Sequence, residues 1–375
     1  MEQIKMVDLN KQYERLKTDI DAAIQEVVDS AAFIQGKQVG EFADSLGKYV
    51  GASAVTCGNG TDALQIAMMA LRFEPGDEVI VPAFTYVATV EVIALLGLTP
   101  VYVDVHEETF NIDVDKLEDV LTSNTVGIVP VDLFGQCAYM EPILEFAERH
   151  NLYVIEDAAQ ALGAEYTFSD GTKKKAGTLG SIGITSFFPS KNLSCFGDGG
   201  ALFSDNQFLV DKIKMIGNHG QREKYCHDII GINSRLDTLQ AAILNVKINQ
   251  LDDFTRRRQQ VAAFYDRELG ELGQVAIPHR APHSTHVFHQ YTLKVTNGNR
   301  DEFKKYLASN NIPSMIYYPL PVHLQKAYRR EGIGEGSFPV AEKLCHSVIS
   351  LPVHTEMSEE QLSYICSTIK KYFNG

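Results

Sequence analysis

Between about residues 50 and 205, short apolar runs alternate with helical patterns, and this alternation limits the possible folds more than any other feature. Several runs are β-branched and apolar on both faces, as strands buried beneath helices on both sides should be. Their order predicts a mostly parallel α/β sheet. The predicted strands are Glu78–Pro82, Pro100–Val105, Gly127–Val131, Leu152–Ile155, Ile184–Phe188 and Ala201–Ser204, with helices such as Thr61–Leu71 and Met140–Arg149 between them.

A second unit is expected, because 375 residues exceed the size of a usual single core. The segment Leu236–Leu269 places apolar residues on roughly one face and predicts one long helix, capped by Asn233 or Ser234. Beyond it, Pro and His become more frequent in an α+β pattern. We predict a large domain at 1–245 and a smaller C-terminal domain at 246–375. The elements predicted in the smaller domain are a strand near Val287–Val295, a helix at Arg300–Ser309 and a C-terminal helix.

Acidic residues outnumber basic ones, 48 against 34, which gives a formal net charge of -14. Such a surface repels nucleic acid and anionic lipid, so neither is an expected partner. The segment Met1–Asn10 lacks the apolar run of a signal peptide, and no stretch approaches the ~20 apolar residues of a membrane span. The six cysteines form no CxxC pairs, which disfavours a zinc site and a disulfide framework. We expect a cytoplasmic protein without a metal centre.

Two charged residues follow predicted strands, at the edge where parallel sheets bind ligands. Asp157, in the segment Ile155–Gln160, is placed to pair with a ring N–H, although capping a helix is an equally good role for such an aspartate. Lys191 follows two hydroxyl residues and precedes a glycine-rich return. Burial there would lower the lysine pKa, as a Schiff-base amine requires. For a lysine taken alone, a solvated loop position is the commoner role.

Two further segments also lie at strand ends. Cys57–Leu64 leads through glycines into a helix whose first turn offers free N–H groups and a hydroxyl, which suits a phosphate. It matches neither the Walker A nor the GxGxxG pattern, and a simple capped helix start is the alternative. Pro82–Thr89 follows a strand directly, and an aromatic side chain there can stack on a flat cofactor or pack in the core.

Taken together and in this order, the four segments resemble fold type I enzymes that use pyridoxal 5′-phosphate (PLP). More narrowly, the sequence resembles the DegT/DnrJ/StrS family of nucleotide-sugar aminotransferases, from Met6–Leu9 near its start to Leu351–His354 near its end. The resemblance implies a large PLP-binding domain with a mostly parallel sheet and a smaller α+β domain. Its motifs here are Asn59–Leu64, Glu156–Gln160, Ser186–Lys191 and Gly231–Leu236.

The resemblance also assigns roles to residues around the cofactor. Lys191 occupies the Schiff-base position and would move a proton between cofactor and sugar carbon. Asp157 would pair with the pyridine nitrogen and keep it protonated. The remaining contacts it implies are Gln160 to the ring hydroxyl, Tyr86 stacked on the ring, and Gly60, Thr61 and Ser186 to the phosphate.

The family completes its phosphate site with an asparagine from a second subunit, and Asn233 matches that position. The resemblance therefore implies a homodimer with a shared active site. Arg235 and Tyr318 occupy positions where the family contacts substrate, and His323 is a further candidate. An ion pair on the long helix is the alternative role for Arg235, and a structural role is the alternative for His323.

The implied reaction takes an amino group from L-glutamate, forms the pyridoxamine form of the cofactor and passes the nitrogen to a nucleotide-diphosphate keto-sugar. The nucleotide would supply binding energy far from the reacting carbon. Such products usually enter surface polysaccharides or glycosylated natural products. The segments most like sugar 3-aminotransferases are Gly58–Leu71, Phe84–Thr89, Gly135–Ala138 and Ser186–Ala201.

Several alternatives remain open from the sequence. A 4-keto-sugar is the other substrate class, and UDP or dTDP, uronate or 6-deoxy sugar, are all compatible with the chain. Related dehydratases carry histidine in place of the lysine, so Lys191 argues against that activity. A non-catalytic regulator would normally add a DNA-binding domain, and a nucleotide-dependent oxidoreductase would need a GxGxxG turn that is missing after the early strands.

Overall fold

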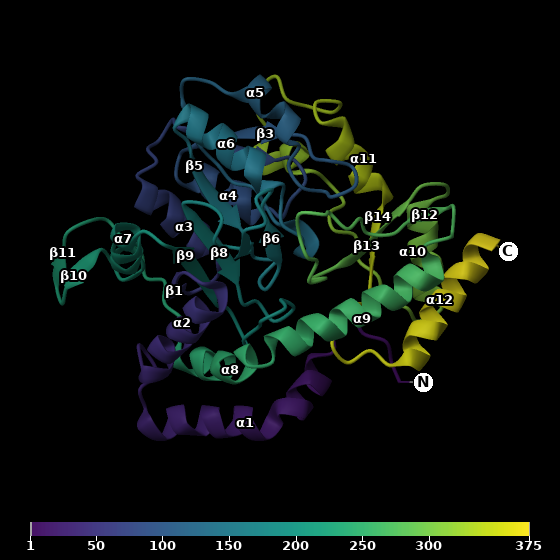
Figure 1. The fold of residues 1–375 in the computed structure, drawn as a ribbon, viewed down its shortest axis with the longest axis horizontal. Helices are drawn as coiled ribbons and strands as arrows, with labels where there is room; N and C mark the ends of the chain where they lie inside the picture. Colours follow the sequence, from purple (N-terminus) through teal and green to yellow (C-terminus); the bar gives the residue numbers. More distant parts are fainter. Residues whose placement is uncertain (1, 375) are drawn as a thin grey trace.

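The structure is a computed structural model, and it describes residues 2–374. Its centre is a seven-stranded sheet (Figure 1). In chain order the strands are β1 (Ser53–Cys57), β2 (Glu78–Pro82), β3 (Thr99–Val103), β4 (Thr125–Ile128), β5 (Tyr153–Asp157), β8 (Ile182–Ser186) and β9 (Gly200–Ser204). Their spatial order is β1-β9-β8-β5-β4-β2-β3. All pairs from β8 to β3 are parallel, whereas β9 runs antiparallel to β1 and β8. The predicted fold class is confirmed.

Each predicted strand overlaps an observed one, with small differences at the ends. Strand β2 has the predicted bounds, whereas β4 ends at Ile128 instead of Val131. Pro130 has no N–H group with which to continue the ladder. Its carbonyl instead accepts a hydrogen bond from Asp157 N at 2.9 Å, so the chain leaves the sheet here but stays beside β5.

Helices cover both faces of the sheet (Figure 1). Alternate strand residues face opposite helical layers, as the period of a strand requires. Val79 and Val81 pack in a cluster with helices α3, α4 and α7, and Ile80 packs on the other face with α5 and α6. Helices α2 and α8 cover β9 on that second face. The helices are α2 (Lys37–Val50), α3 (Gly60–Leu71), α4 (Ala88–Leu95), α5 (Leu117–Val120), α6 (Met140–His150), α7 (Gln207–Gly217) and α8 (Thr238–Ile248).

The prediction of one long helix over Leu236–Leu269 is wrong, because two helices occupy this segment. Helix α8 ends at Ile248, and α9 (Leu251–Leu269) begins after a break of two residues. At the break, Asn249 Nδ2 donates a hydrogen bond to Asn245 O at 2.9 Å, a side-chain contact that competes with regular helix bonding. The first residue of α9, Leu251, is buried in the cluster beneath α2. Helix α1 (Leu9–Ser30) packs across α8.

The C-terminal part is an α+β unit. Helix α9 connects α8, beside the sheet, to this unit (Figure 1). Its apolar cluster includes Ile4 from the N-terminal segment, so the beginning of the chain packs beside its end. Its elements are the antiparallel strands β12 (Val275–Ala276), β13 (Tyr291–Val295) and β14 (Val348–Leu351), with α10 (Arg300–Ser309), α11 (Pro339–Ser347) and α12 (Glu359–Asn374). The domain bounds 1–245 and 246–375 stay a prediction.

Short elements complete the chain. Among residues 2–374, no helix combines the length and apolar character that crossing a membrane demands. The short elements are the hairpins β6 (Glu165–Thr167) with β7 (Lys173–Lys175) and β10 (Gln221–Glu223) with β11 (Cys226–His227), and the 3-10 helices Val114–Lys116, Leu133–Gly135, Val322–Leu324 and Lys326–Tyr328.

Close backbone packing under β8 gives a first prediction. A Cβ on Gly183 would lie 1.8 Å from Gly177 O. We expect Gly183→Ala to lower the free energy of unfolding by about 3 kcal/mol, the upper range for overpacking. Gly40→Ala in α2 is the control, because its Cβ meets nothing within 4 Å; it should raise stability by about 0.5–1 kcal/mol. Urea unfolding checks both, and equal stability of the two variants would contradict the packing argument.

Candidate active site

A cavity of about 610 Å³ lies at the carboxyl ends of the parallel strands. Loops that follow β1, β2, β4, β5 and β8 form its floor, and the segments 289–290 and 317–318 form a wall. This is where open α/β sheets bind ligands. It brings together eight of the residues singled out in the sequence, namely Gly60, Thr61, Tyr86, Asp157, Gln160, Ser186, Lys191 and Tyr318.

One end of the cavity has the features of an anion site. Asn59 caps α3, and its Oδ1 accepts a hydrogen bond from Asp62 N at 2.8 Å. The amides of Gly60 and Thr61 belong to the first helical turn, where N–H groups have no acceptor within the helix. A Cβ on Gly60 would lie 2.9 Å from Ser186 Cβ, so only glycine lets the turn approach that strand end. Free amides, the helix dipole and a hydroxyl converge here, as phosphate binding requires.

Asp157 is a buried carboxyl group in the lining of the cavity, which also includes Asp62 and Asp198. The side chain is 6% exposed, and its Oδ1 and Oδ2 accept hydrogen bonds from Ala159 N at 3.1 Å and from Thr89 Oγ1 at 3.0 Å. Burial raises the pKa of Asp157, and its two donors and the charge of Lys191 act against that rise. A buried carboxylate held by only two donors favours a cationic partner, such as a protonated ring nitrogen.

Lys191 is the amine of the cavity. Its backbone N donates to Phe188 O at 2.8 Å, which closes a turn just beyond β8. Burial lowers the pKa of Lys191 to about 8, and the Asp157 charge acts against the drop. With this pKa about a tenth of the amine is unprotonated at pH 7 and about half at pH 8, and the unprotonated form is the nucleophile.

Gln160, Tyr318 and Tyr86 form the wall beside these charges. Gln160 Oε1 accepts from Phe134 N at 2.9 Å, and Gln160 Nε2 donates to Tyr318 Oη at 3.1 Å, which leaves one amide hydrogen for a ligand. The rings of Tyr86 and Tyr318 lie 6.1 Å apart. Tyr86 is 55% exposed, so one ring face is open for stacking on a flat ligand.

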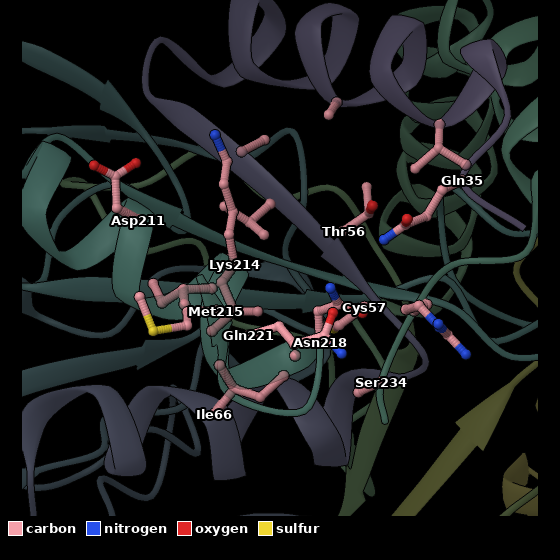
Figure 2. A pocket seen from close by; sticks show the side chains of 18 of the residues that line it. Gln35, Thr56, Cys57, Ile66, Asp211, Lys214, Met215, Asn218, Gln221 and Ser234 are labelled. Carbon is pink, nitrogen blue, oxygen red and sulfur yellow. The ribbon is translucent and has the colours of Figure 1, made fainter. Parts of the chain in front are cut away.

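Three predicted site residues lie elsewhere in this chain. Arg235 lines a second cavity of about 660 Å³, whose lining also includes Cys57 and Ser234, both labelled in Figure 2. Its neighbour Ser234 accepts from Gly58 N at 2.9 Å and donates to Asp62 Oδ2 at 2.6 Å, so this segment braces the anion-binding turn from behind. Asn233 is exposed. The structure therefore brings the segment next to the turn but not into the first cavity.

His323, the third of these residues, is fully buried outside the lining of the first cavity. Its Nε2 lies 3.1 Å from Glu342 Oε1, and its ring packs between Tyr102 and Phe338. These contacts suit a structural role that joins the 3-10 turn Val322–Leu324 to α11.

Sequence reasoning missed His289 and Gln290, which line the cavity opposite the strand ends. Buried Arg258 in α9 holds this turn by donating from Nη1 to Phe288 O at 3.1 Å and to Val353 O at 2.8 Å. The only hint in the sequence was an arginine at a helix position that faces the core. Across the described part of the chain, no cluster of three His, Cys, Asp or Glu side chains is arranged to hold a metal ion.

Comparison with known proteins links this geometry to an enzyme family. The model of the DegT/DnrJ/EryC1/StrS aminotransferase family matches residues 14–370. A pleiotropic regulatory protein of Geobacillus stearothermophilus is 44% identical, with 99% of this chain and 98% of the relative covered. A UDP-2-acetamido-2-deoxy-3-oxo-D-glucuronate aminotransferase of Pseudomonas aeruginosa is 42% identical, with 98% and 99% covered.

Solved structures share the whole fold. The Streptomyces venezuelae enzyme DesV, determined in complex with a ketimine intermediate, superimposes with a TM-score of 0.95 at 37% identity, covering all of both chains. The Bacillus subtilis protein NtdA, determined with its bound cofactor PMP, gives a TM-score of 0.91 at 29% identity, covering 100% of this chain and 86% of NtdA.

The lowered pKa of Lys191 gives a second prediction. Reductive methylation with formaldehyde needs the neutral amine, so the rate at Lys191 should rise with pH and level off above about 8. A short lysine peptide added to the sample serves as the reference, and its rate should still be rising at that pH, because an unperturbed lysine titrates at ~10.4. Peptide mass spectrometry measures both rates. Parallel pH profiles for the two lysines would contradict the effect of burial.

Proposed function

The chain belongs to the DegT/DnrJ/EryC1/StrS aminotransferase family, and we propose that it transfers an amino group from L-glutamate to the C3 keto group of a nucleotide-diphosphate sugar. The observation that carries this proposal is the meeting of Lys191, Asp157 and the α3 N-terminus in one cavity. An amine of lowered pKa, a buried carboxylate and an anion site are the three groups that amino transfer with a phosphorylated aldehyde cofactor needs.

The cofactor is PLP, which alternates with its pyridoxamine form during transamination. The residues present fit it, because the anion-binding end, the carboxylate and the stacking ring surround one cavity of suitable chemistry. When bound, PLP acts as an electron sink that stabilises negative charge at the substrate carbon. The residues that would hold it are Gly60, Thr61 and Ser186 at the phosphate, Tyr86 at the ring face, Asp157 at the ring nitrogen and Gln160 at the ring hydroxyl.

The protein's own groups direct the proton movements. Lys191 Nζ, kept partly neutral by burial, accepts a proton from one carbon and returns it to another. Asp157 holds a proton on the ring nitrogen, because separating a buried carboxylate from its cation is costly. The hydrogen bond between Gln160 and Tyr318 holds that wall of the cavity in place.

The ring position follows from the sugar enzymes among the relatives. The Pseudomonas aeruginosa relative acts, by its name, on a 3-oxo sugar, and it is 42% identical over nearly the whole chain. This favours C3 as the position aminated here, in the synthesis of amino sugars for polysaccharides or glycosylated products. A 4-keto sugar remains the alternative. The 44% identical relative carries a regulatory name, but a cavity with a reactive lysine favours catalysis in this chain.

We extend the proposal to a homodimer with shared active sites. Lys191 and His289 are the basic residues that line the cavity, which is little positive charge for a nucleotide diphosphate and a dicarboxylate donor. A second copy can supply Asn233 and Arg235, which are exposed and half-buried in the single chain. Large apolar side chains on the surface suit such an interface. Phe33, Ile34, Phe188 and Ile230 are among the large apolar side chains exposed in the single chain.

The cytoplasm is the compartment that we propose. All six cysteines lie within residues 2–374 and are unpaired there, which suits a reducing environment.

Amino transfer gives a third prediction. Protein loaded with PLP should show a visible absorption band, and L-glutamate should replace it with a near-ultraviolet band, because the amino group of glutamate converts the cofactor to its pyridoxamine form and 2-oxoglutarate is released. Lys191→Ala should lack the starting band of a lysine-bound cofactor. The treated protein is then offered UDP- and dTDP-linked 3-keto and 4-keto sugars, and recovery of the visible band identifies the acceptor.

The controls separate the alternatives. A visible band that glutamate leaves unchanged would favour a cofactor-binding regulator over an enzyme. If no band forms while Lys191 is intact, the transaminase proposal fails.

Site sharing gives a fourth prediction. Asn233→Ala and Lys191→Ala should each be nearly inactive as homodimers. In a mixed dimer, one site combines intact Lys191 with intact Asn233 from the other chain, so random mixing should restore about a quarter of wild-type activity. Steady-state rates before and after unfolding and refolding the mixture together measure this. A mixture no more active than its two parents would rule out sharing through Asn233.

A further inference from the structure

Two carboxyl groups that take no part in the proposed reaction lie side by side behind the active site. Glu156 precedes Asp157 in β5, so its side chain points to the opposite face of the sheet from the cavity. Asp132 follows the end of β4 and meets Glu156 there. Both side chains are 0% exposed. Two buried carboxylates in contact repel each other strongly, so such pairs hold a proton between them.

The hydrogen bonds of Glu156 are those of an ionised carboxylate. Its Oε1 accepts from Gly177 N and its Oε2 accepts from Leu179 N, each at 2.7 Å. Both oxygens are thus occupied as acceptors of backbone N–H groups. A proton on either oxygen would weaken the bond that this oxygen accepts, whereas the second lone pair of an ionised oxygen can still accept a further hydrogen bond.

Asp132 has the complementary pattern. Its Oδ1 accepts from Ala138 N at 2.9 Å, whereas its Oδ2 is buried and receives no hydrogen bond from any donor of the described chain. The neighbouring side chain is the Glu156 carboxylate, which can accept a hydrogen bond but cannot donate one when ionised. A hydrogen on Asp132 Oδ2 would let this oxygen donate a hydrogen bond to the Glu156 carboxylate. An ionised Asp132 would leave Oδ2 without a hydrogen-bond partner in the core.

We propose that Asp132 is a protonated carboxylic acid that donates a hydrogen bond to Glu156, and that this pair positions Asp157 and Gln160 from behind the sheet. Burial raises the pKa of Asp132 well above its usual range, and the Glu156 charge adds to that rise. Burial also raises the pKa of Glu156, but its backbone donors act against the rise. The other titratable groups that face the pair are Asp157 and the Cys137 thiol, and neither carries a positive charge.

The pair is bonded to the loops that carry the cofactor contacts. Asp132 N donates to Asp157 O at 3.0 Å. Two residues after Asp132, Phe134 N donates a hydrogen bond to Gln160 Oε1 at 2.9 Å. Glu156 fixes the segment Gly177–Leu179, which leads into β8 and so to Lys191. The positioning role rests on the proposed function, because Asp157 and Gln160 matter only if they contact the cofactor.

Proton linkage tests the protonated acid directly. Asn at 132 keeps an acceptor for Ala138 N and gives Glu156 an N–H donor without binding a proton. Wild type must retain a proton that its unfolded chain releases above about pH 4, so unfolding releases one more proton from wild type than from Asp132→Asn. In urea unfolding of the holoenzyme at fixed protein and PLP concentrations, the folding constant of the variant relative to wild type should rise with pH above about pH 5, by about tenfold per pH unit while folded Asp132 keeps its proton.

Asp104→Asn is the matched control. Asp104 accepts from Val340 N at 2.9 Å and from Ala341 N at 2.8 Å, so Asn there must turn an amide N–H toward a backbone N–H. This variant should be less stable than wild type, without the tenfold rise per pH unit. A flat ratio for Asp132→Asn over the same pH range would overturn the protonated acid, whatever the enzyme's activity.

The positioning role has its own readout. Asp132→Leu removes both hydrogen bonds, so the pH midpoint of the visible band and the PLP dissociation constant should both move away from wild type, whereas Asp132→Asn should keep both. Equal values in wild type and Asp132→Leu would overturn positioning. Failure of the amino-transfer proposal is recognised separately, because it would appear as a wild-type band that glutamate does not change.

Discussion

Desolvation beside the β5 and β8 strand ends is the constraint on which the chemistry depends. Burial lowers the pKa of Lys191 and raises the pKa of Asp157, so each group is less charged than it would be in water. Their mutual attraction acts against both shifts. A bound cofactor with a cationic ring nitrogen would supply the partner that Asp157 lacks and leave the amine free to react. The seven-stranded sheet thus holds these two groups in a state that cofactor binding completes.

That desolvation requires the backbone to pack unusually closely around the site. Gly60 approaches Ser186 at a distance that admits no Cβ, and Gly200 approaches the backbone of Asn59 even more closely. These contacts bring the α3 N-terminus against the ends of β8 and β9, so the anion site and the lysine share one cavity. The antiparallel β9 follows the Lys191 loop and lies between β8 and the edge strand β1. It therefore joins the strand that ends at the lysine loop to the strand that precedes the α3 N-terminus.

The two faces of β5 each present a carboxyl group, and the two groups lie in different environments. Asp157 faces the cavity, where few donors leave it ready for a cationic partner. Glu156 faces the core, where backbone amides and Asp132 satisfy it completely. The period of the strand puts these neighbours in opposite environments. The carboxyl group that faces the cavity therefore adjoins, along the strand, one whose hydrogen bonds lie in the core.

The sequence by itself determined the fold class, the order of the strands along the chain and the chemical type of the groups at their ends. These follow from local patterns, because a buried strand must be apolar and a strand end must carry any reactive group. The tertiary structure alone decided the break between α8 and α9, the entry of His289 and Gln290 into the cavity and the contact of Asp132 with Glu156. It also placed His323 against Glu342 and Arg235 in a second cavity. Each depends on packing between residues far apart in the chain, which no local pattern encodes, because burial and partners arise only when the segments meet.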